Sequence, residues 1–188
     1  VFLLLYTRNS KFIHFLIFFA VISVVGAVSQ TGNNLMKIPF VDIFNGISFG
    51  LLYTLLFILD KLMYKKNDQF IYTLIFPSLF ALTEFLLAFA FGTWGSMVHT
   101  QYEFLSFLQI SSIIGIYGVW FMMNWFASIV YWIIENKDHK QKVIRSTVIF
   151  IVVFGSIIIF GILRIQAESS SENSVKFAKE AGMISQAT

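Results

Sequence analysis

Residues 70–91, FIYTLIFPSLFALTEFLLAFAF, decide the fold class, because this stretch has the length and composition of a membrane-spanning helix. A helix needs about 20 apolar residues to cross the hydrocarbon part of a bilayer. The stretch contains one charged residue, Glu84, among almost wholly apolar side chains. It lacks the polar–apolar alternation that is typical of a membrane-barrel strand. We therefore expect an all-α integral membrane protein.

Four further apolar stretches of spanning length occur along the chain. They lie at about residues 12–29, 43–64, 105–134 and 147–163. Together with 70–91 they predict a bundle of about five transmembrane helices, with residues 1–164 forming the membrane domain. The 105–134 stretch is longer than one span requires, so we expect it to tilt or bend, or to begin as an interfacial segment.

The composition supports this interpretation and excludes other classes. Hydrophobic residues make up 57% of the chain and charged residues only 12%, whereas soluble domains contain roughly 25% charged residues. A net charge of +3, scattered along the chain, does not indicate a nucleic-acid partner. The absence of cysteine excludes a cysteine nucleophile or a thiolate metal site within this chain.

Both ends of the sequence suggest a piece of a longer protein. The apolar residues 1–6 precede the polar TRNS at 7–10. That order resembles the last turns of a membrane helix, whereas a signal peptide carries its positive charge first. Residues 165–188 form a polar tail. We expect an N-terminal helix stub, and a tail that could be the start of another domain.

The distribution of Lys and Arg predicts the orientation, because basic residues accumulate in cytoplasmic loops. Threading five spans through a bilayer puts nine of the 13 basic residues on one side: Arg8, Lys11, Lys61, Lys65, Lys66, Lys137, Lys140, Lys142 and Arg145. The other side receives Lys37, Arg164, Lys176 and Lys179. We expect a multi-pass protein of the plasma (inner) membrane with cytoplasmic basic loops. The 92–104 loop and the C-terminal tail are then extracytoplasmic.

Small residues at helical spacing predict close helix packing. Gly46 and Gly50 form a GxxxG pair, and Ser111 and Gly115 repeat the spacing with Gly118 nearby. Small side chains let helix backbones approach closely in lipid. The alternative is that these glycines have no packing role, because glycine is common in membrane helices.

Two acidic residues lie inside predicted spans. Glu84 is near the outer end of 70–91, where burying a charge in lipid costs about 3 kcal/mol. It could shape a polar, outward-facing site, or it could be a hydrogen-bond anchor between helices. Asp60 lies near the basic end of its span, where we expect it to pair with a nearby base. We expect the neighbouring Lys61 to extend its amine toward the interface.

The 92–104 loop, GTWGSMVHTQYEF, combines glycines, aromatic rings and hydrogen-bonding groups without a basic residue. Such a loop could border a site for a lipid chain or an amphiphilic head group, or it could be an ordinary connection. Aromatic residues often mark membrane boundaries, so we interpret Trp94, Tyr131 and Trp132 as interfacial anchors. The three histidines fall on opposite sides of the predicted bilayer, and no metal or cofactor is expected.

Several short blocks, in order, resemble the membrane domain of apolipoprotein N-acyltransferases and related membrane-anchored carbon-nitrogen hydrolases. The blocks are FGTWGS at 91–96, TQY at 100–102, LQ at 108–109, GIYG at 115–118 and NWFAS at 124–128. Glu84, following Pro77, matches the acidic position before this set. The resemblance covers about residues 77–134. The family often has an Arg soon after the acidic position, whereas residues 86–91 are apolar here.

The resemblance implies a function. Such enzymes join a membrane bundle to an outward-facing nitrilase-like domain, whose Glu-Lys-Cys triad takes an acyl chain from a phospholipid as a thioester. The chain then passes to the amino group of a lipoprotein. This splitting of one transfer into two steps is nucleophilic catalysis. The triad cannot be assigned within this chain, so the membrane domain would position the phospholipid donor and the lipoprotein acceptor. We place Glu84, Trp94, Gln101 and Tyr102 at the substrate entrance.

Two other functional classes stay open at this point. A transporter or channel subunit predicts pore-lining polar residues in several spans, and here only Glu84 and Asn124 approach that pattern. A noncatalytic membrane scaffold requires nothing beyond packed helices.

Overall fold

A computed structural model describes residues 1–30, 39–64, 69–91 and 96–169. Every regular element in these ranges is helical. The elements are α1 (Phe2–Asn9), α2 (His14–Gln30), α3 (Pro39–Met63), η1 (Phe70–Leu74), α4 (Ile75–Phe91), η2 (Met97–Gln101), α5 (Leu105–Leu108), α6 (Ser111–Glu135) and α7 (Lys140–Ser169). The two η elements are short 3₁₀ helices.

Four helices in the described part of the chain are long and apolar enough to cross a membrane. They cover Pro39–Met63, Phe70–Phe89, Ser111–Glu135 and Lys140–Ala167. The shorter apolar helix His14–Ser29 adds a fifth candidate. The predicted all-α membrane fold is therefore confirmed. The short N-terminal helix is also present, and it extends through Arg8 to Asn9. The part of the predicted polar tail beyond Ser169 lies outside the described residues.

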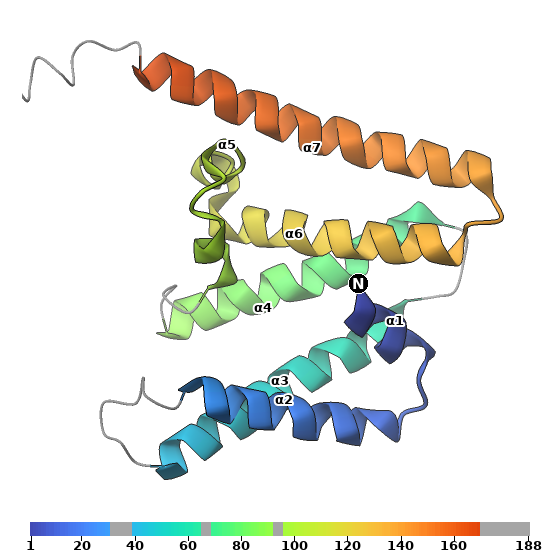
Figure 1. Cartoon of the computed structure of the whole chain (residues 1–188), viewed down its shortest axis with the longest axis vertical. Helices are drawn as coiled ribbons and strands as arrows, with labels where there is room; N and C mark the ends of the chain where they lie inside the picture. Colours follow the sequence, from blue (N-terminus) through green and yellow to red (C-terminus); the bar gives the residue numbers. More distant parts are fainter. Residues whose placement is uncertain (31–38, 65–68, 92–95, 170–188) are drawn as a thin grey trace, which may run out of the picture.

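The helices form two groups, which Figure 1 shows as a lower pair and an upper set. In the lower pair, α2 packs along α3. A Cβ atom at Gly46 would lie 2.7 Å from the Cβ of Ala27 and still closer to the Ser23 carbonyl oxygen. A Cβ atom at Gly50 would meet the side-chain hydroxyl of Ser23. At both glycines α2 lies too close to α3 to leave room for a side chain, and glycine permits that approach because it has none.

In the upper set, α4 packs on α6, while α7 lies beside α5 and α6. The Trp125 indole of α6 donates a hydrogen bond to Thr73 Oγ1 of η1 at 3.1 Å. Its ring also meets Phe150 of α7, with centroids 5.1 Å apart. Gly161 of α7 faces the backbone of Ser106 in α5. Aromatic packing and one buried hydrogen bond thus join three segments of this set.

The long stretch predicted at 105–134 is divided. The four-residue α5 precedes α6, and α6 itself is interrupted at Gly115, whose φ of 68° and ψ of −178° are not helical. Residues with a side chain rarely adopt this conformation, and glycine adopts it readily. Among the described residues, a Cβ atom at Gly115 would meet only Tyr117. The nearest atoms to a Cβ at Gly118 belong to Ile114 of the same helix. Ser111 is the first residue of α6.

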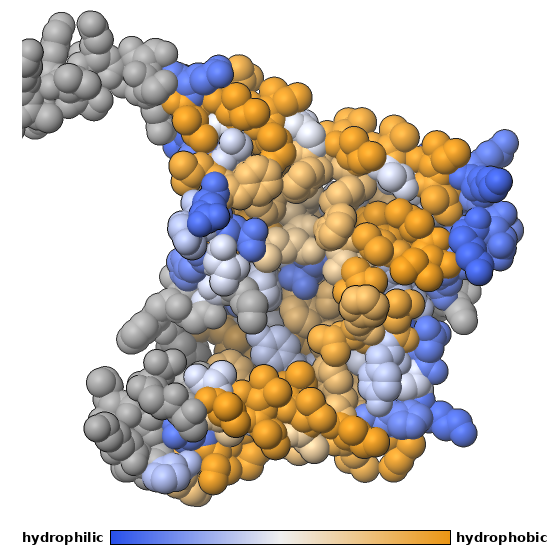
Figure 2. Space-filling view, in the orientation of Figure 1, coloured by the Kyte–Doolittle hydropathy of each residue, from blue (hydrophilic) through white to orange (hydrophobic). Residues whose placement is uncertain are grey.

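The surface is dominated by apolar side chains, as Figure 2 shows for one face. Phe89 of α4 is 89% exposed and Leu51 of α3 is 62% exposed. In water such exposure would be unfavourable, whereas in a bilayer the lipid chains cover these side chains. Hydrophilic residues collect at the ends of the helices in the same view.

The two ends of the bundle differ in composition. At the basic end, α1, α3 and α6 finish and α7 begins, and Arg8, Lys61 and Lys140 belong to these termini. At the opposite end, α4 finishes close to η2, α5 and the start of α6. Gln101 and Tyr102 therefore lie at the other end of the helices from Arg8, Lys61 and Lys140.

Candidate functional site

The structure describes three of the four predicted entrance residues. Glu84 lies in α4 and is half-buried, and it is close enough to Tyr53 of α3 for an electrostatic interaction. Gln101 ends η2 and donates from Nε2 to Thr100 Oγ1 at 3.0 Å. Tyr102 follows it and is 67% exposed. Trp94 lies outside the described residues.

These side chains share one end of the bundle but do not form a single network. Among the described residues, no hydrogen bond joins Glu84 to Gln101 or Tyr102. The 3₁₀ helix η2 begins after Ser96, whose Oγ accepts a hydrogen bond from the Val98 amide at 3.3 Å. This turn packs on α6 through Val98, which is buried. Gln101 and Tyr102 thus form a polar rim at this end of the apolar helices.

Below this rim, α3 and α4 are in contact only along part of their lengths. Phe57 of α3 meets Phe76 and Phe80 of α4, with ring centroids 5.5 and 5.6 Å apart. Tyr53 also meets Phe80, at 6.0 Å. Nearer the start of α3, Gly46 and Gly50 face α2. The side chain of Leu51 in the same part of α3 is exposed. In Figure 1 the two helices diverge in that direction.

The surface is hollowed between the lower helix pair and the upper set in Figure 2. Both helices carry exposed apolar side chains: Ile47 on α3 and Leu86 on α4 are each about half exposed or more, whereas Phe85 of α4 packs on Tyr117 of α6, with ring centroids 5.2 Å apart. The half-buried Glu84 belongs to the same part of α4. These parts of α3 and α4 thus combine exposed apolar side chains with one carboxylate.

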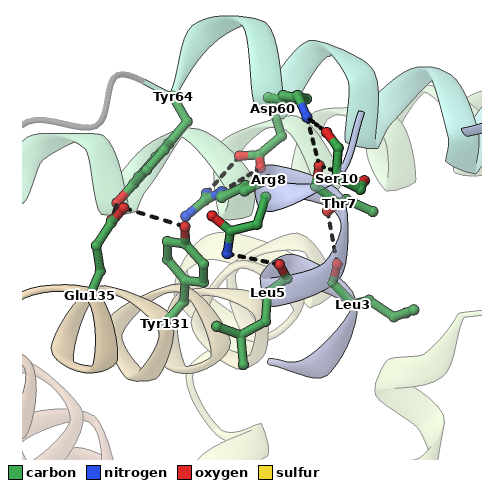
Figure 3. A network of polar contacts seen from close by, with 11 residues as sticks. Leu3, Leu5, Thr7, Arg8, Ser10, Asp60, Tyr64, Tyr131 and Glu135 are labelled. Carbon is green, nitrogen blue, oxygen red and sulfur yellow. Dashed lines mark hydrogen bonds and ion pairs between the residues drawn. The ribbon is translucent and has the colours of Figure 1, made fainter. Parts of the chain in front are cut away.

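A second polar group lies at the basic end, and Figure 3 shows it from close by. Arg8 Nε and Nη2 donate to the two carboxylate oxygens of Asp60 at 2.7 and 2.8 Å. The side chains are 2% and 0% exposed, so the ion pair is fully buried. The Arg8 guanidinium carbon also lies 3.6 Å from the centre of the Tyr64 ring and 4.6 Å from that of Tyr131.

Further contacts complete this basic-end cluster, which consists of Arg8, Asp60, Lys61, Tyr64, Tyr131 and Glu135. Lys61 Nζ donates to the carbonyl oxygens of Thr7, at 3.2 Å, and Ser10. A cation is favourable at these carbonyls because they end α1, where the helix dipole is negative. The Glu135 carboxylate accepts hydrogen bonds from the Tyr64 and Tyr131 hydroxyls. The cluster therefore ties together α1, α3 and α6.

A comparison with protein-family models identifies the family. The model of the apolipoprotein N-acyltransferase N-terminal domain matches residues 1–129. The chain belongs to this family. The resemblance predicted from the sequence is confirmed, and the match extends further toward the N-terminus than the residues that first indicated it. Searches of curated proteins and of solved structures found no match.

The match to the N-acyltransferase N-terminal domain includes the entrance residues but only part of the basic-end cluster. Glu84, Gln101 and Tyr102 lie within the matched residues, as do Arg8 and Asp60. Tyr131, Glu135 and the whole of α7 lie beyond them. The basic-end cluster is thus completed by residues outside the matched domain.

The sequence indicated one partner of the buried ion pair in the basic-end cluster. The expectation that Asp60 pairs with a nearby base agrees with the structure, but the partner, Arg8, could not be identified from 52 residues away. The interpretation of Tyr131 and Trp132 as interfacial anchors is wrong, because they are 2% and 1% exposed and belong to the protein interior. The sequence did contain a signal for the Tyr131–Glu135 contact, since these residues are four positions apart and share a helix face.

Proposed function

We propose that this chain positions a phospholipid acyl donor and a lipoprotein acceptor for acyl transfer by a nitrilase-like domain outside it. Membership of the N-acyltransferase N-terminal domain family supports the membrane role. The observation that carries the proposal is the separation of α3 and α4 toward the end that holds Glu84, Gln101 and Tyr102.

The hollow that Figure 2 shows between the lower helix pair and the upper set suits substrates that stay anchored in the bilayer by their own chains. An acyl chain could move sideways from the lipid into the space between α3 and α4 without crossing water. Transfer of each methylene into water would cost about 0.8 kcal/mol, so a lateral route avoids a large barrier. The head group would then reach the polar rim.

The polar residues would hold that head group at the height of the reacting bond. Glu84 could accept a hydrogen bond from an ammonium or hydroxyl group, and Gln101 and Tyr102 could bind ester or phosphate oxygens. Trp94, as an amphipathic ring, would suit the same boundary. Holding two reactants in a productive geometry contributes to catalysis because it removes the entropy cost of bringing them together.

This function requires a defined orientation. The basic end would face the cytoplasm of a cell with this protein in its inner membrane, and the 92–104 loop and C-terminal tail would face outward. The catalytic domain would then lie on the extracytoplasmic side, above the separated ends of α3 and α4.

The proposal is tested by replacing the entrance residues in the full-length protein. We expect alanine at Glu84, Trp94, Gln101 and Tyr102 together to reduce transfer of an acyl chain to a lipoprotein acceptor at least tenfold, the order of effect expected when positioning is lost. The lipoprotein product is measured by mass spectrometry. The control carries alanine at the lipid-exposed Ile151, Val152 and Ile159 of α7. Unchanged transfer in the entrance variant would refute the assignment.

A further inference from the structure

A pocket of about 250 Å³ lies beside the basic-end cluster. It occurs where α1, α3 and α6 meet, at the opposite end of the helices from the candidate entrance. Its lining consists of Arg8, Asn9, Lys61, Tyr64, Tyr131 and Glu135. Because one water occupies roughly 30 Å³ in the liquid, the pocket has room for a phosphate group together with several waters.

One wall of the pocket offers unused hydrogen-bond donors. Arg8 Nη1 is buried, and among the described residues it has no acceptor, while the other guanidinium nitrogens bind Asp60. Lys61 Nζ donates to the carbonyl oxygens of Thr7 and Ser10, which leaves one of its three N–H bonds for another acceptor. A buried donor without an acceptor is unfavourable, so an oxygen-rich ligand at this wall would be stabilising.

The other wall carries the opposite charge. The Glu135 carboxylate accepts from the hydroxyls of Tyr64 and Tyr131, and it faces the same pocket. A simple anion would be attracted by Arg8 and Lys61 but repelled by Glu135. A ligand that combines a phosphate with an ammonium group satisfies both walls.

The surroundings point to a ligand with an apolar part. Lys61 Nζ lies 5.3 Å from the centre of the Phe12 ring, and Phe12 is exposed, as is the neighbouring Ile13. These side chains would contact the glycerol and acyl portion of a lipid. Basic pockets between membrane helices near the bilayer surface are known to bind phospholipid head groups.

We propose that this pocket binds the head group of a membrane aminophospholipid. Its phosphate oxygens accept from Arg8 Nη1 and Lys61 Nζ, and its ammonium group donates to Glu135. The bound lipid fills the junction of α1, α3 and α6 at the basic end. This site is separate from the acyl-transfer entrance, and it does not require that the proposed function be correct.

The test measures lipid retention by the full-length protein in mild detergent, using native mass spectrometry. Phosphatidylethanolamine, phosphatidylglycerol and inorganic phosphate are added separately. Loss of a hydrogen bond to a charged group weakens binding by about tenfold or more, so Lys61→Gln should lower phosphatidylethanolamine affinity by that factor. Lys137→Gln removes an exposed positive charge outside the pocket lining and should retain the lipid as the unchanged protein does.

A second variant tests the ammonium contact and does not depend on how Lys61→Gln folds. Glu135→Gln keeps an acceptor for the Tyr64 hydroxyl but removes the negative charge. We expect it to bind phosphatidylethanolamine and phosphatidylglycerol about equally, whereas the unchanged protein prefers phosphatidylethanolamine. Equal lipid retention by Lys61→Gln and the unchanged protein, or an unaltered preference in Glu135→Gln, would overturn the proposal. Displacement of the lipid by inorganic phosphate would identify a free-phosphate site instead.

Discussion

Arg8 and Asp60 are 52 positions apart in the chain and form a two-pronged ion pair inside the helix bundle. The pair joins α1 to α3, and stacking of Arg8 on Tyr131 extends the contact to α6. Buried ion pairs contribute little net stability when compared with apolar replacements, because both charges lose their hydration. Their energetic importance appears when one partner is removed and the other stays buried alone.

The ion pair therefore predicts an asymmetry between single and double replacements. Asp60→Ala leaves the Arg8 guanidinium buried without its partner, so we expect the free energy of unfolding to fall by about 3–5 kcal/mol. The measurement is denaturant unfolding of the full-length protein in micelles, followed by tryptophan fluorescence.

The matched variant combines Arg8→Met with Asp60→Leu and removes both charges at once. We expect it to be closer in stability to the unchanged protein than Asp60→Ala is, because no unpaired charge remains buried. A double variant at least as unstable as Asp60→Ala would contradict this account of the pair.

Two glycines of α7 offer a matched test of helix packing. A Cβ atom at Gly161 would lie 2.6 Å from the Ser106 carbonyl carbon of α5, whereas at Gly155 no described atom lies within 4 Å. We expect Gly161→Ala to lower the free energy of unfolding by about 1–3 kcal/mol, because backbone must move. Gly155→Ala should be neutral or stabilising by up to about 1 kcal/mol, the helix-propensity difference. Thermal unfolding of both variants in micelles measures this difference, and equal losses would contradict it.

The α2–α3 contact predicts an order of effects at its two glycines. A new Cβ atom at Gly46 meets the Ser23 backbone oxygen, which can move only with α2, whereas at Gly50 the closest atom is the Ser23 hydroxyl oxygen, which can rotate. We therefore expect Gly46→Ala to destabilise the protein more than Gly50→Ala. Thermal unfolding in micelles tests this order. If Gly50→Ala were the more damaging, the close approach would have to lie elsewhere along the two helices.

The sequence predicted the membrane class and the positions of the apolar helices, because insertion into lipid depends mainly on composition and length. Four of the five predicted spans are long helices in the described residues, and the fifth, His14–Ser29, is shorter. It predicted Gly46 and Gly50 as packing residues because a spacing of four residues is visible in the sequence itself. The contribution of their contact to function stays a prediction. The break at Gly115 was not specified, since the uninterrupted apolar pattern of 105–134 allowed a bend, a tilt or an interfacial start. The structure has both a short separate helix and a distorted turn.

The candidate sites were less predictable than the fold. Hydropathy indicates that a polar residue in a span needs a partner, because its burial in lipid costs free energy, but it does not identify that partner. The sequence therefore indicated that Asp60 is paired without indicating that Arg8 is the partner. Aromatic residues near a span end suit either the interface or a buried cation, and for Tyr131 the second applies. Trp94 lies outside the described residues, so its place at the entrance stays a prediction.

The orientation of the helices is the remaining prediction, and the chain is well suited to test it because it contains no cysteine. Glu103, after η2, and Asp138, between α6 and α7, are both exposed and lie at opposite ends of the bundle. In intact cells, a membrane-impermeant maleimide should label Glu103→Cys, whereas Asp138→Cys should react only after the membrane is permeabilised, because basic loops stay in the cytoplasm. Labelling is measured on the full-length protein by gel shift. The unsubstituted protein gives the background from any cysteine outside this chain. Reaction of Asp138→Cys without permeabilisation would show the opposite orientation. The separated ends of α3 and α4 would then face the cytoplasm, away from an outward-facing catalytic domain.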